Sequence, residues 1–125
     1  MKEKTADILD LTVPPASVGV IMDKVDEIAR KFNTTIPVYG HAGDGNFHHH
    51  LLNDLQDRGI VHQVKREIYQ ETIKLGGVIT GEHGVGVIRI PDLDLCPDGK
   101  TWALMRGIKN VFDPNNILNP GVGLL

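Results

Sequence analysis

Cysteine, positive charge and long apolar runs are all scarce in this sequence, and each shortage excludes a class of protein. Cys96 is the single cysteine, so an internal disulfide framework is excluded and a reducing cytoplasm is the expected location. The formal net charge is −3 at pH 7, which gives no basic surface for nucleic acid or for an anionic membrane. No apolar run approaches membrane-spanning length, and the charged N-terminus lacks the pattern of a signal peptide. We therefore expect neither a nucleic-acid partner nor a transmembrane segment.

Histidine and glycine, by contrast, are plentiful. The 125 residues include six histidines and 14 glycines, and both types concentrate in two short stretches, residues 40–50 and 81–86. The length suits one domain, and the hydrophobic fraction of 41% is ordinary for a globular protein. We therefore expect residues 1–125 to form a single domain whose chemistry lies in those two stretches.

Hydrophobic periodicity predicts alternating strands and helices. The predicted strands are Ile8–Val13, Ile36–Gly40, Phe47–Leu52 and Val78–Thr80, with Val87–Ile90 extending the last one or forming another. Three helices are predicted. The first begins after Ser17, its N-cap, and the other two span Val61–Leu75 and Thr101–Phe112. Pro91–Gly99 is predicted to be a loop, and the tail Asn115–Leu125 to be extended.

The order of these elements indicates an α+β protein. Two β-α-β units joined by a hairpin are typical of a ferredoxin-like fold, in which helices cover one face of an antiparallel sheet. The last helix and the extended tail are additional to that fold. The tail is rich in Pro, Asn and Gly, so we expect it to dock on a surface outside this sequence rather than to build a core of its own.

The first histidine-rich stretch lies at the predicted hairpin. His41 ends the second strand and His48 begins the third, so a tight glycine-rich turn brings two imidazoles side by side. Strand alternation places His48 and His50 on one face and His49 on the other. His41 and His48 can therefore share a metal ion. His50, and Asn46 from the turn, are candidates for supporting that site or contacting a substrate.

A second glycine-flanked stretch follows the predicted strand at 78–80, with the sequence Gly81-Glu82-His83-Gly84-Val85-Gly86. Glu82 can supply a carboxylate oxygen and so complete a set of two histidines and one carboxylate. Such a set suits zinc, manganese or non-haem iron and leaves coordination positions for a substrate. His83 is then free to transfer protons, because imidazole titrates close to neutral pH.

Each of these residues also has an ordinary structural explanation. A lone histidine in either stretch is more often a hydrogen-bonded structural residue than a metal ligand. Glu82 can be a plain surface carboxylate, and Asp44 and Asn46 are typical turn formers. His49 and His62 are expected to have no chemical role. The residues alone thus indicate a divalent metal site and leave the reaction open.

Three segments in a fixed order resemble one known family. They are Gly40-His41-Ala42-Gly43-Asp44-Gly45-Asn46-Phe47-His48, Gly81–Gly86, and Phe112-Asp113-Pro114-Asn115-Asn116-Ile117-Leu118-Asn119-Pro120-Gly121. Together they are similar to the signatures of the C-terminal domain of FAD-linked oxidases. That family includes the glycolate oxidase D subunit, D-lactate dehydrogenase and D-2-hydroxyglutarate dehydrogenase. The resemblance runs from about Asp10 onward, and three motifs in order are far more specific than any one of them.

The resemblance implies a role for each matched position in the two histidine-containing stretches. His41, His48 and Glu82 match the family's metal ligands, for which zinc or manganese is expected. His83 matches the histidine that takes the proton from the substrate hydroxyl. His50 falls where members carry a polar residue near the substrate. The implied reaction oxidises a 2-hydroxy acid to a 2-oxo acid, with hydride transfer to FAD.

The resemblance also implies a partner. Asn119 and Gly121 match a tail segment that returns toward the flavin, yet the large FAD-binding domain of the family has no counterpart in this sequence. We therefore expect the chain to need an FAD-binding domain or subunit and to be inactive alone. An apolar docking face left exposed would favour a homo-oligomer.

Two other functions remain open at this stage. One is a non-catalytic module that kept the fold and binds a metal or a partner protein. The other is a metallohydrolase that uses the same two histidines and glutamate, with water in the open position. The identity of the 2-hydroxy acid is not readable from the sequence.

Overall fold

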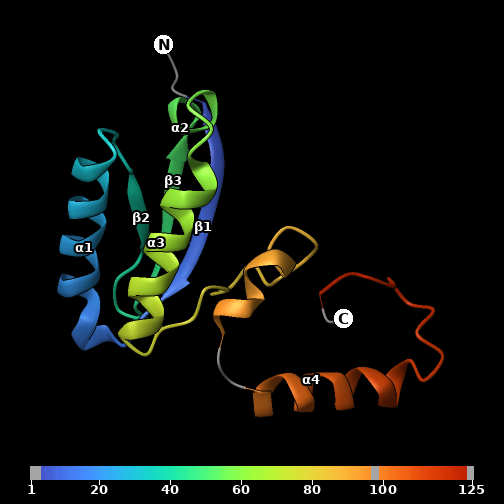
Figure 1. The fold of residues 1–125 in the computed structure, drawn as a ribbon. Helices are drawn as coiled ribbons and strands as arrows, with labels where there is room; N and C mark the ends of the chain where they lie inside the picture. The colour runs from blue at the N-terminus through green and yellow to red at the C-terminus, as the bar shows by residue number, and fades with distance from the viewer. Residues whose placement is uncertain (1–3, 97–98, 124–125) are drawn as a thin grey trace. The chain divides into compact units, whose positions relative to one another are not determined.

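A computed structural model describes residues 4–96 and 99–123 of the chain. The chain divides into two compact units, Met1–His83 and Gly84–Leu125 (Figure 1). His41, His48 and Glu82 all belong to the first unit. Within the described part of the chain, no helix combines the length and the apolar character that crossing a membrane requires.

The first unit is an antiparallel sheet with helices packed on it. Strand β1 (Thr5–Thr12) is followed by the 3₁₀ turn η1 (Pro15–Ser17), helix α1 (Val18–Lys31), and the hairpin of β2 (Val38–His41) and β3 (Asn46–Leu52). A short helix, α2 (Asn53–Asp57), leads into α3 (Val61–Lys74). The sheet order is β1-β3-β2, and both pairs are antiparallel. The predicted α+β class is thereby confirmed.

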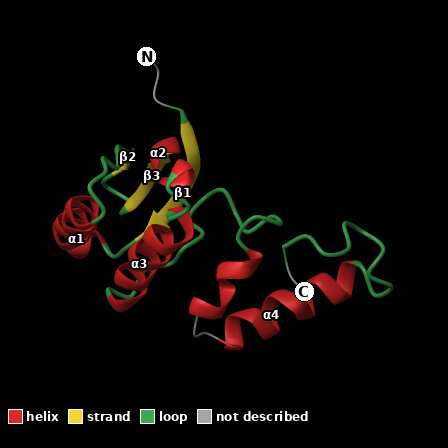
Figure 2. Ribbon diagram, turned by 45° about the horizontal axis from the view of Figure 1, so that its top comes forward, coloured by secondary structure: helices red, strands yellow, loops and turns green. Residues whose placement is uncertain are grey.

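The two long helices of this unit follow the predicted apolar stripes. In α1 the buried residues Ile21, Val25 and Ile28 recur at helical spacing, and α3 buries a similar row that includes Val64 and Ile68. Helix α3 contacts both α1 and β1. Figures 1 and 2 show α1 and α3 on the same face of the sheet, as a ferredoxin-like arrangement requires.

The two faces of the sheet differ in chemistry. The face toward the helices is buried and, apart from His49, apolar, and it includes Leu9, Leu11, Phe47 and Leu51. Asp10 lies between the two leucines of β1 and is paired with His48 of β3, so these two side chains point to the opposite face. That face holds the candidate site.

The predicted fourth strand at Val78–Thr80 is wrong in its extent. A single antiparallel bridge joins Val78 to Thr12 on the side of β1 that β3 leaves free, where a ferredoxin-like fold places its fourth strand. The ladder ends because the chain turns after Gly81, whose N–H donates to the Asp10 carbonyl at 3.0 Å. The next two N–H groups donate to the Asp10 carboxylate instead of continuing the ladder.

The second unit contains a 3₁₀ segment η2 (Ile90–Leu95) and helix α4 (Gly99–Phe112). The predicted helix is confirmed, but the predicted strand at Val87–Ile90 is wrong. Residues 86–89 form a turn, because Gly86 has φ +54° and the Arg89 N–H donates to the Val85 carbonyl at 3.2 Å. Most of the predicted loop after residue 90 is η2 rather than irregular chain.

The described part of the tail is a series of turns, so the predicted extended conformation is wrong for residues 115–123. The carboxylate of Asp113 accepts hydrogen bonds from the N–H groups of Ile117 and Leu118, at 2.9 and 3.0 Å. These bonds fold the chain back just after α4. The two last residues of the predicted extended segment lie outside the described residues.

Candidate metal centre

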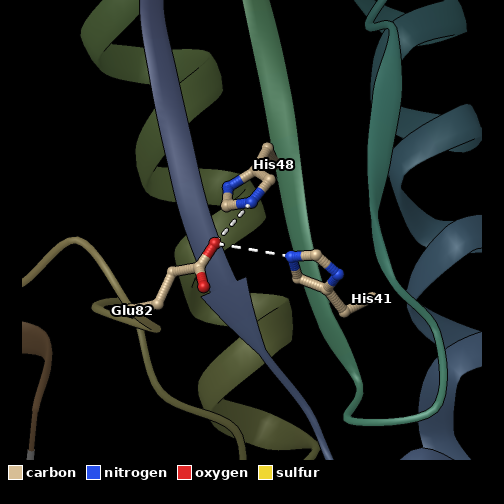
Figure 3. Close-up of side chains that lie close together, drawn as sticks. All are labelled: His41, His48 and Glu82. Atoms are coloured by element: carbon tan, nitrogen blue, oxygen red, sulfur yellow. Dashed lines mark ion pairs between the residues drawn. The ribbon is translucent and has the colours of Figure 1, made fainter.

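His41, His48 and Glu82 come from three separate segments and meet at one point. Figure 3 shows both imidazoles pointing toward the carboxylate. The Glu82 Oε1 atom lies 3.0 Å from His48 Nε2 and 3.7 Å from His41 Nε2. One ligand atom from each residue falls within 4.8 Å of the others, which is close enough for a single metal ion to replace the ion pairs.

The hairpin places the two histidines, and its glycines are required for the close turn. His41 ends β2 and pairs with Asn46 at the start of β3. A Cβ atom on Gly40 would lie 2.3 Å from the Asn46 carbonyl oxygen. Gly45 has φ +71°, and a Cβ there would lie 2.0 Å from the Val13 carbonyl oxygen. Neither position accepts a side chain without moving the hairpin.

A buried carboxylate of β1 holds the segment that carries Glu82. The Oδ2 atom of Asp10 accepts the backbone N–H groups of Glu82 and His83, each at 2.7 Å. Its Oδ1 atom accepts a hydrogen bond from Asn46 Nδ2 at 2.8 Å. This one carboxylate therefore links three segments that are distant in sequence: β1, the start of β3 and residues 82–83.

Asp10 is ionised although it is buried. Burial raises the pKa of this carboxyl, but hydrogen bonds from the His83 backbone, the Asn46 side chain and the Glu82 backbone together outweigh burial and hold the pKa below its ordinary value. Sequence reasoning did not identify this residue. Alternation with Leu9 and Leu11 places Asp10 on the outer face of the strand, where an aspartate is ordinarily exposed, so the local pattern gave no signal for its burial.

His83 lies against two of the three candidate ligands, His48 and Glu82. Its ring is stacked on the ring of His48, with centroids 4.9 Å apart and planes inclined by 14°. Its Nε2 atom lies 3.9 Å from Glu82 Oε1, and the side chain is 58% exposed. An exposed imidazole beside a carboxylate can exchange a proton both with a neighbouring molecule and with solvent.

His50 lies on the same face as His48 but is not part of the cluster. Its Nδ1 atom is 3.2 Å from the Thr5 hydroxyl. The ring of Tyr39 lies beside both histidines, with centroids 5.1 Å from His48 and 5.0 Å from His50. The predicted contact of His50 with a substrate stays a prediction, and Tyr39 is a neighbour that sequence reasoning did not single out.

Asn46 is buried and ties the hairpin to β1. Besides Asp10, its Nδ2 atom donates to the Leu11 carbonyl and to the Thr12 hydroxyl, both at 3.0 Å. This bonding makes Asn46 a structural link beneath the site. Its predicted role toward a substrate stays a prediction.

The remaining predicted positions lie away from the cluster. His49 is fully buried on the helix side of the sheet, where burial lowers its pKa to about 4. His62 is exposed in α3. Asn119 and Gly121 belong to the second unit and both have positive φ. Their predicted place near a flavin stays a prediction.

The donor set fits a divalent metal of the zinc or manganese type. Two imidazole nitrogens and one carboxylate oxygen leave coordination positions for a substrate or water. His48 also has Asp10 behind it, with Oδ1 3.6 Å from its Nδ1 atom. A carboxylate behind a metal-binding imidazole is a common arrangement in metal sites.

Comparison with known proteins finds relatives that match most of this chain. The family model described as FAD linked oxidases, C-terminal domain, matches residues 1–122. The chain is 38% identical over 120 residues to the glycolate oxidase subunit GlcD of Bacillus subtilis, a match that covers 94% of this chain and 26% of the relative.

Two other relatives carry different substrate names. D-lactate dehydrogenase of Archaeoglobus fulgidus is 38% identical over 122 residues, which covers 97% of this chain and 27% of the relative. A probable mitochondrial D-2-hydroxyglutarate dehydrogenase of Oryza sativa is 34% identical over 113 residues. That match covers 89% of this chain and 20% of the relative. The chain spans about a quarter of the length of the curated relatives it matches.

Proposed function

Because this chain belongs to the family of FAD-linked oxidase C-terminal domains, we propose that it forms the metal- and substrate-binding part of a flavin-dependent 2-hydroxy-acid dehydrogenase. The observation that carries the proposal is the meeting of His41, His48 and Glu82, with His83 stacked beside them. Since the chain spans only about a quarter of its relatives, the activity of the whole protein is part of the proposal.

In the proposed site, His41, His48 and Glu82 hold a divalent ion, zinc or manganese. Such an ion, when bound, lowers the pKa of a nearby substrate hydroxyl. FAD, when bound, supplies the acceptor for the hydride that leaves C2 of the substrate. The Nε2 atom of His83 takes the hydroxyl proton. The substrate thereby loses one hydride and one proton and becomes a 2-oxo acid.

The position of His83 supports this role. The backbone of His83 is fixed by Asp10, while its imidazole remains 58% exposed beside Glu82. A fixed backbone keeps the ring near the site, and exposure lets the proton pass on to solvent after each turnover. Both properties suit a general base that works repeatedly.

A 2-hydroxy acid is the proposed substrate class. The three relatives are named for glycolate, D-lactate and D-2-hydroxyglutarate, which share the 2-hydroxy-carboxylate group and differ in the substituent at C2. A metal beside a proton acceptor acts on the shared group. His50 and Asn46 are the proposed supporting or substrate-contacting residues on the same side of the sheet.

An FAD-binding domain or subunit is the proposed partner, and we expect the chain to be inactive without it. We further propose that residues 1–125 act together as one C-terminal domain, since a single family model spans residues 1–122. In this arrangement Asn119 and Gly121 lie near the flavin. The single cysteine favours a reducing cytoplasm as the location.

Elemental metal analysis of the purified, untagged chain tests the proposed site. We expect near-stoichiometric zinc or manganese in the wild type and its loss in His41→Ala and Glu82→Ala, because each variant removes one of three donors. His62→Ala is the matched control, since it removes an exposed histidine of α3 and should retain the metal.

Two outcomes would contradict the proposal. A folded wild-type chain that takes up neither zinc nor manganese in equilibrium dialysis would show that these residues do not form a metal site by themselves. Equal metal loss in His62→Ala would show that the bound metal is not held by the cluster.

A further inference from the structure

Asp10 occupies an unusual position for a charged residue. It lies in the middle of β1 between two fully buried leucines, and only 3% of its surface is exposed. In the strand register it is directly opposite His48, one of the proposed metal ligands. A buried carboxylate is costly unless its oxygens are fully bonded, so its partners show what it stabilises.

The hydrogen-bond partners of Asp10 include Glu82 and His83, the proposed metal ligand and the proposed base. The Oδ2 atom accepts the N–H groups of Glu82 and His83, each at 2.7 Å. The Oδ1 atom is occupied by Asn46 Nδ2. One carboxylate therefore fixes the backbone of both the proposed carboxylate ligand and the proposed base. Bonds from N–H groups to an anion are about twice as strong as neutral ones.

Gly81, which precedes Glu82, lies too close to this carboxylate for any side chain to fit. A Cβ atom on Gly81 would lie 2.2 Å from Asn46 Nδ2 and 2.5 Å from Asp10 Oδ1. The backbone thus approaches the Asp10–Asn46 pair more closely than any other residue type permits. Because Gly81 has no required positive φ, contact with this pair, rather than backbone conformation, explains the glycine.

The same carboxylate also lies behind His48. Its Oδ1 atom is 3.6 Å from His48 Nδ1, while the opposite ring atom, Nε2, faces Glu82 at 3.0 Å. Attraction to an anion favours a proton on Nδ1, and this leaves the Nε2 lone pair for a metal.

We propose that Asp10 is the positioning residue of the site: it sets the backbone of Glu82 and His83 and orients the His48 ring, without binding the metal itself. The effect of Asp10 on metal binding rests on the proposed function. Its effect on the backbone of Glu82 and His83 does not require a metal. Since the contacts exist within the chain alone, they can be measured in metal-free protein.

The first measurement is the rate of hydrogen exchange at the Glu82 and His83 amides. It is measured by NMR on the metal-free 125-residue chain. In Asp10→Asn the new amide group matches the carboxylate in shape but cannot accept both N–H groups as an anion does. We expect exchange at these two amides to rise about 10- to 100-fold, the loss expected for a hydrogen bond to a charged group. Asp44→Asn is the control, because it makes the same charge change at an exposed turn position.

The second measurement is titration with Co²⁺, whose visible absorption reports the number and geometry of its ligands. We expect Asp10→Asn to bind Co²⁺ about 10- to 100-fold more weakly than wild type. Its spectrum should match that of Glu82→Gln, because Glu82 is no longer held in place. A general loss of stability would not produce that match.

A second variant keeps the inference testable if Asp10→Asn does not fold. Gly81→Ala keeps every charge and inserts a methyl group between the turn and the Asp10–Asn46 pair, and it should weaken Co²⁺ binding with the same spectral change. Wild-type exchange rates in Asp10→Asn would overturn the inference, as would a wild-type cobalt spectrum. If wild-type protein binds no metal, the proposed function fails, and the exchange rates still decide the role of Asp10.

Discussion

The two proposed histidine ligands have very different surroundings. The side chain of His48 is 5% exposed and is enclosed by Asp10, Tyr39 and His83, whereas the side chain of His41 is 59% exposed. The cluster is therefore buried on the β3 side and exposed on the β2 side. His83 is likewise 58% exposed, so the proposed base lies on the same exposed side of the cluster as His41.

At the residue scale, we predict that His83→Gln separates chemistry from metal binding. Glutamine has a similar size but cannot take a proton, so turnover of the proposed flavoenzyme, assembled with an FAD-binding domain, should fall by about 10²- to 10⁴-fold. Metal content measured by elemental analysis should be unchanged, because His83 is not one of the three ligands. Full activity in His83→Gln, with His62→Gln as control, would remove His83 from the mechanism.

Strand β3 serves the core and the site at the same time. Its odd positions, Phe47, His49 and Leu51, face the helices, while His48 and His50 face the other way. A one-residue shift of this strand would bring His48 into the core and His49 into the site. The register is fixed by the buried leucines of β1, so the same packing that stabilises the sheet also selects which histidine meets Glu82.

At the element scale, the core histidine predicts a pH dependence of stability. Burial lowers the pKa of His49 from 6.5 to about 4, so between these values the unfolded chain binds more protons than the folded chain. The free energy of unfolding should therefore fall as pH drops from about 6.5 to about 4, by about 3 kcal/mol at most.

This prediction is checked by urea unfolding at several pH values in the presence of a chelator. His49→Leu should remove most of the slope in this pH range, because leucine does not titrate. His62→Leu should retain it, since His62 is exposed. An unchanged slope in His49→Leu would assign the pH dependence to other groups.

The second unit presents an apolar helix surface. The residues Leu104, Ile108, Val111 and Phe112 recur at helical spacing on α4, and each is 61% exposed or more. An apolar stripe of this kind on a water-exposed helix marks a contact surface for another protein.

At the scale of the whole molecule, we predict that the isolated 125-residue chain self-associates through α4. Burying the stripe removes apolar surface from water, which favours association. Light scattering should give a mass that rises with concentration. Ile108→Glu combined with Phe112→Glu should give a monomer, while Val20→Glu, at an exposed valine of α1, should not. A monomeric wild type over a wide concentration range would refute the prediction.

The sequence by itself determined the features that depend on neighbouring residues. Apolar spacing placed α1, α3 and α4, and alternation in β3 separated His48 from His49. The glycine-rich turn implied that His41 and His48 meet, because a hairpin joins strand ends that are close in sequence. These inferences required no knowledge of distant contacts.

Only the tertiary structure decided the features that join distant segments. Asp10 is 72 residues from Glu82, and no local pattern indicates that its carboxylate accepts the Glu82 N–H. That contact also ends the predicted fourth strand after a single bridge at Val78. The physical reason is that a buried anion must satisfy its oxygens with whatever donors the fold brings near, and this competes with strand pairing in a way that periodicity does not record.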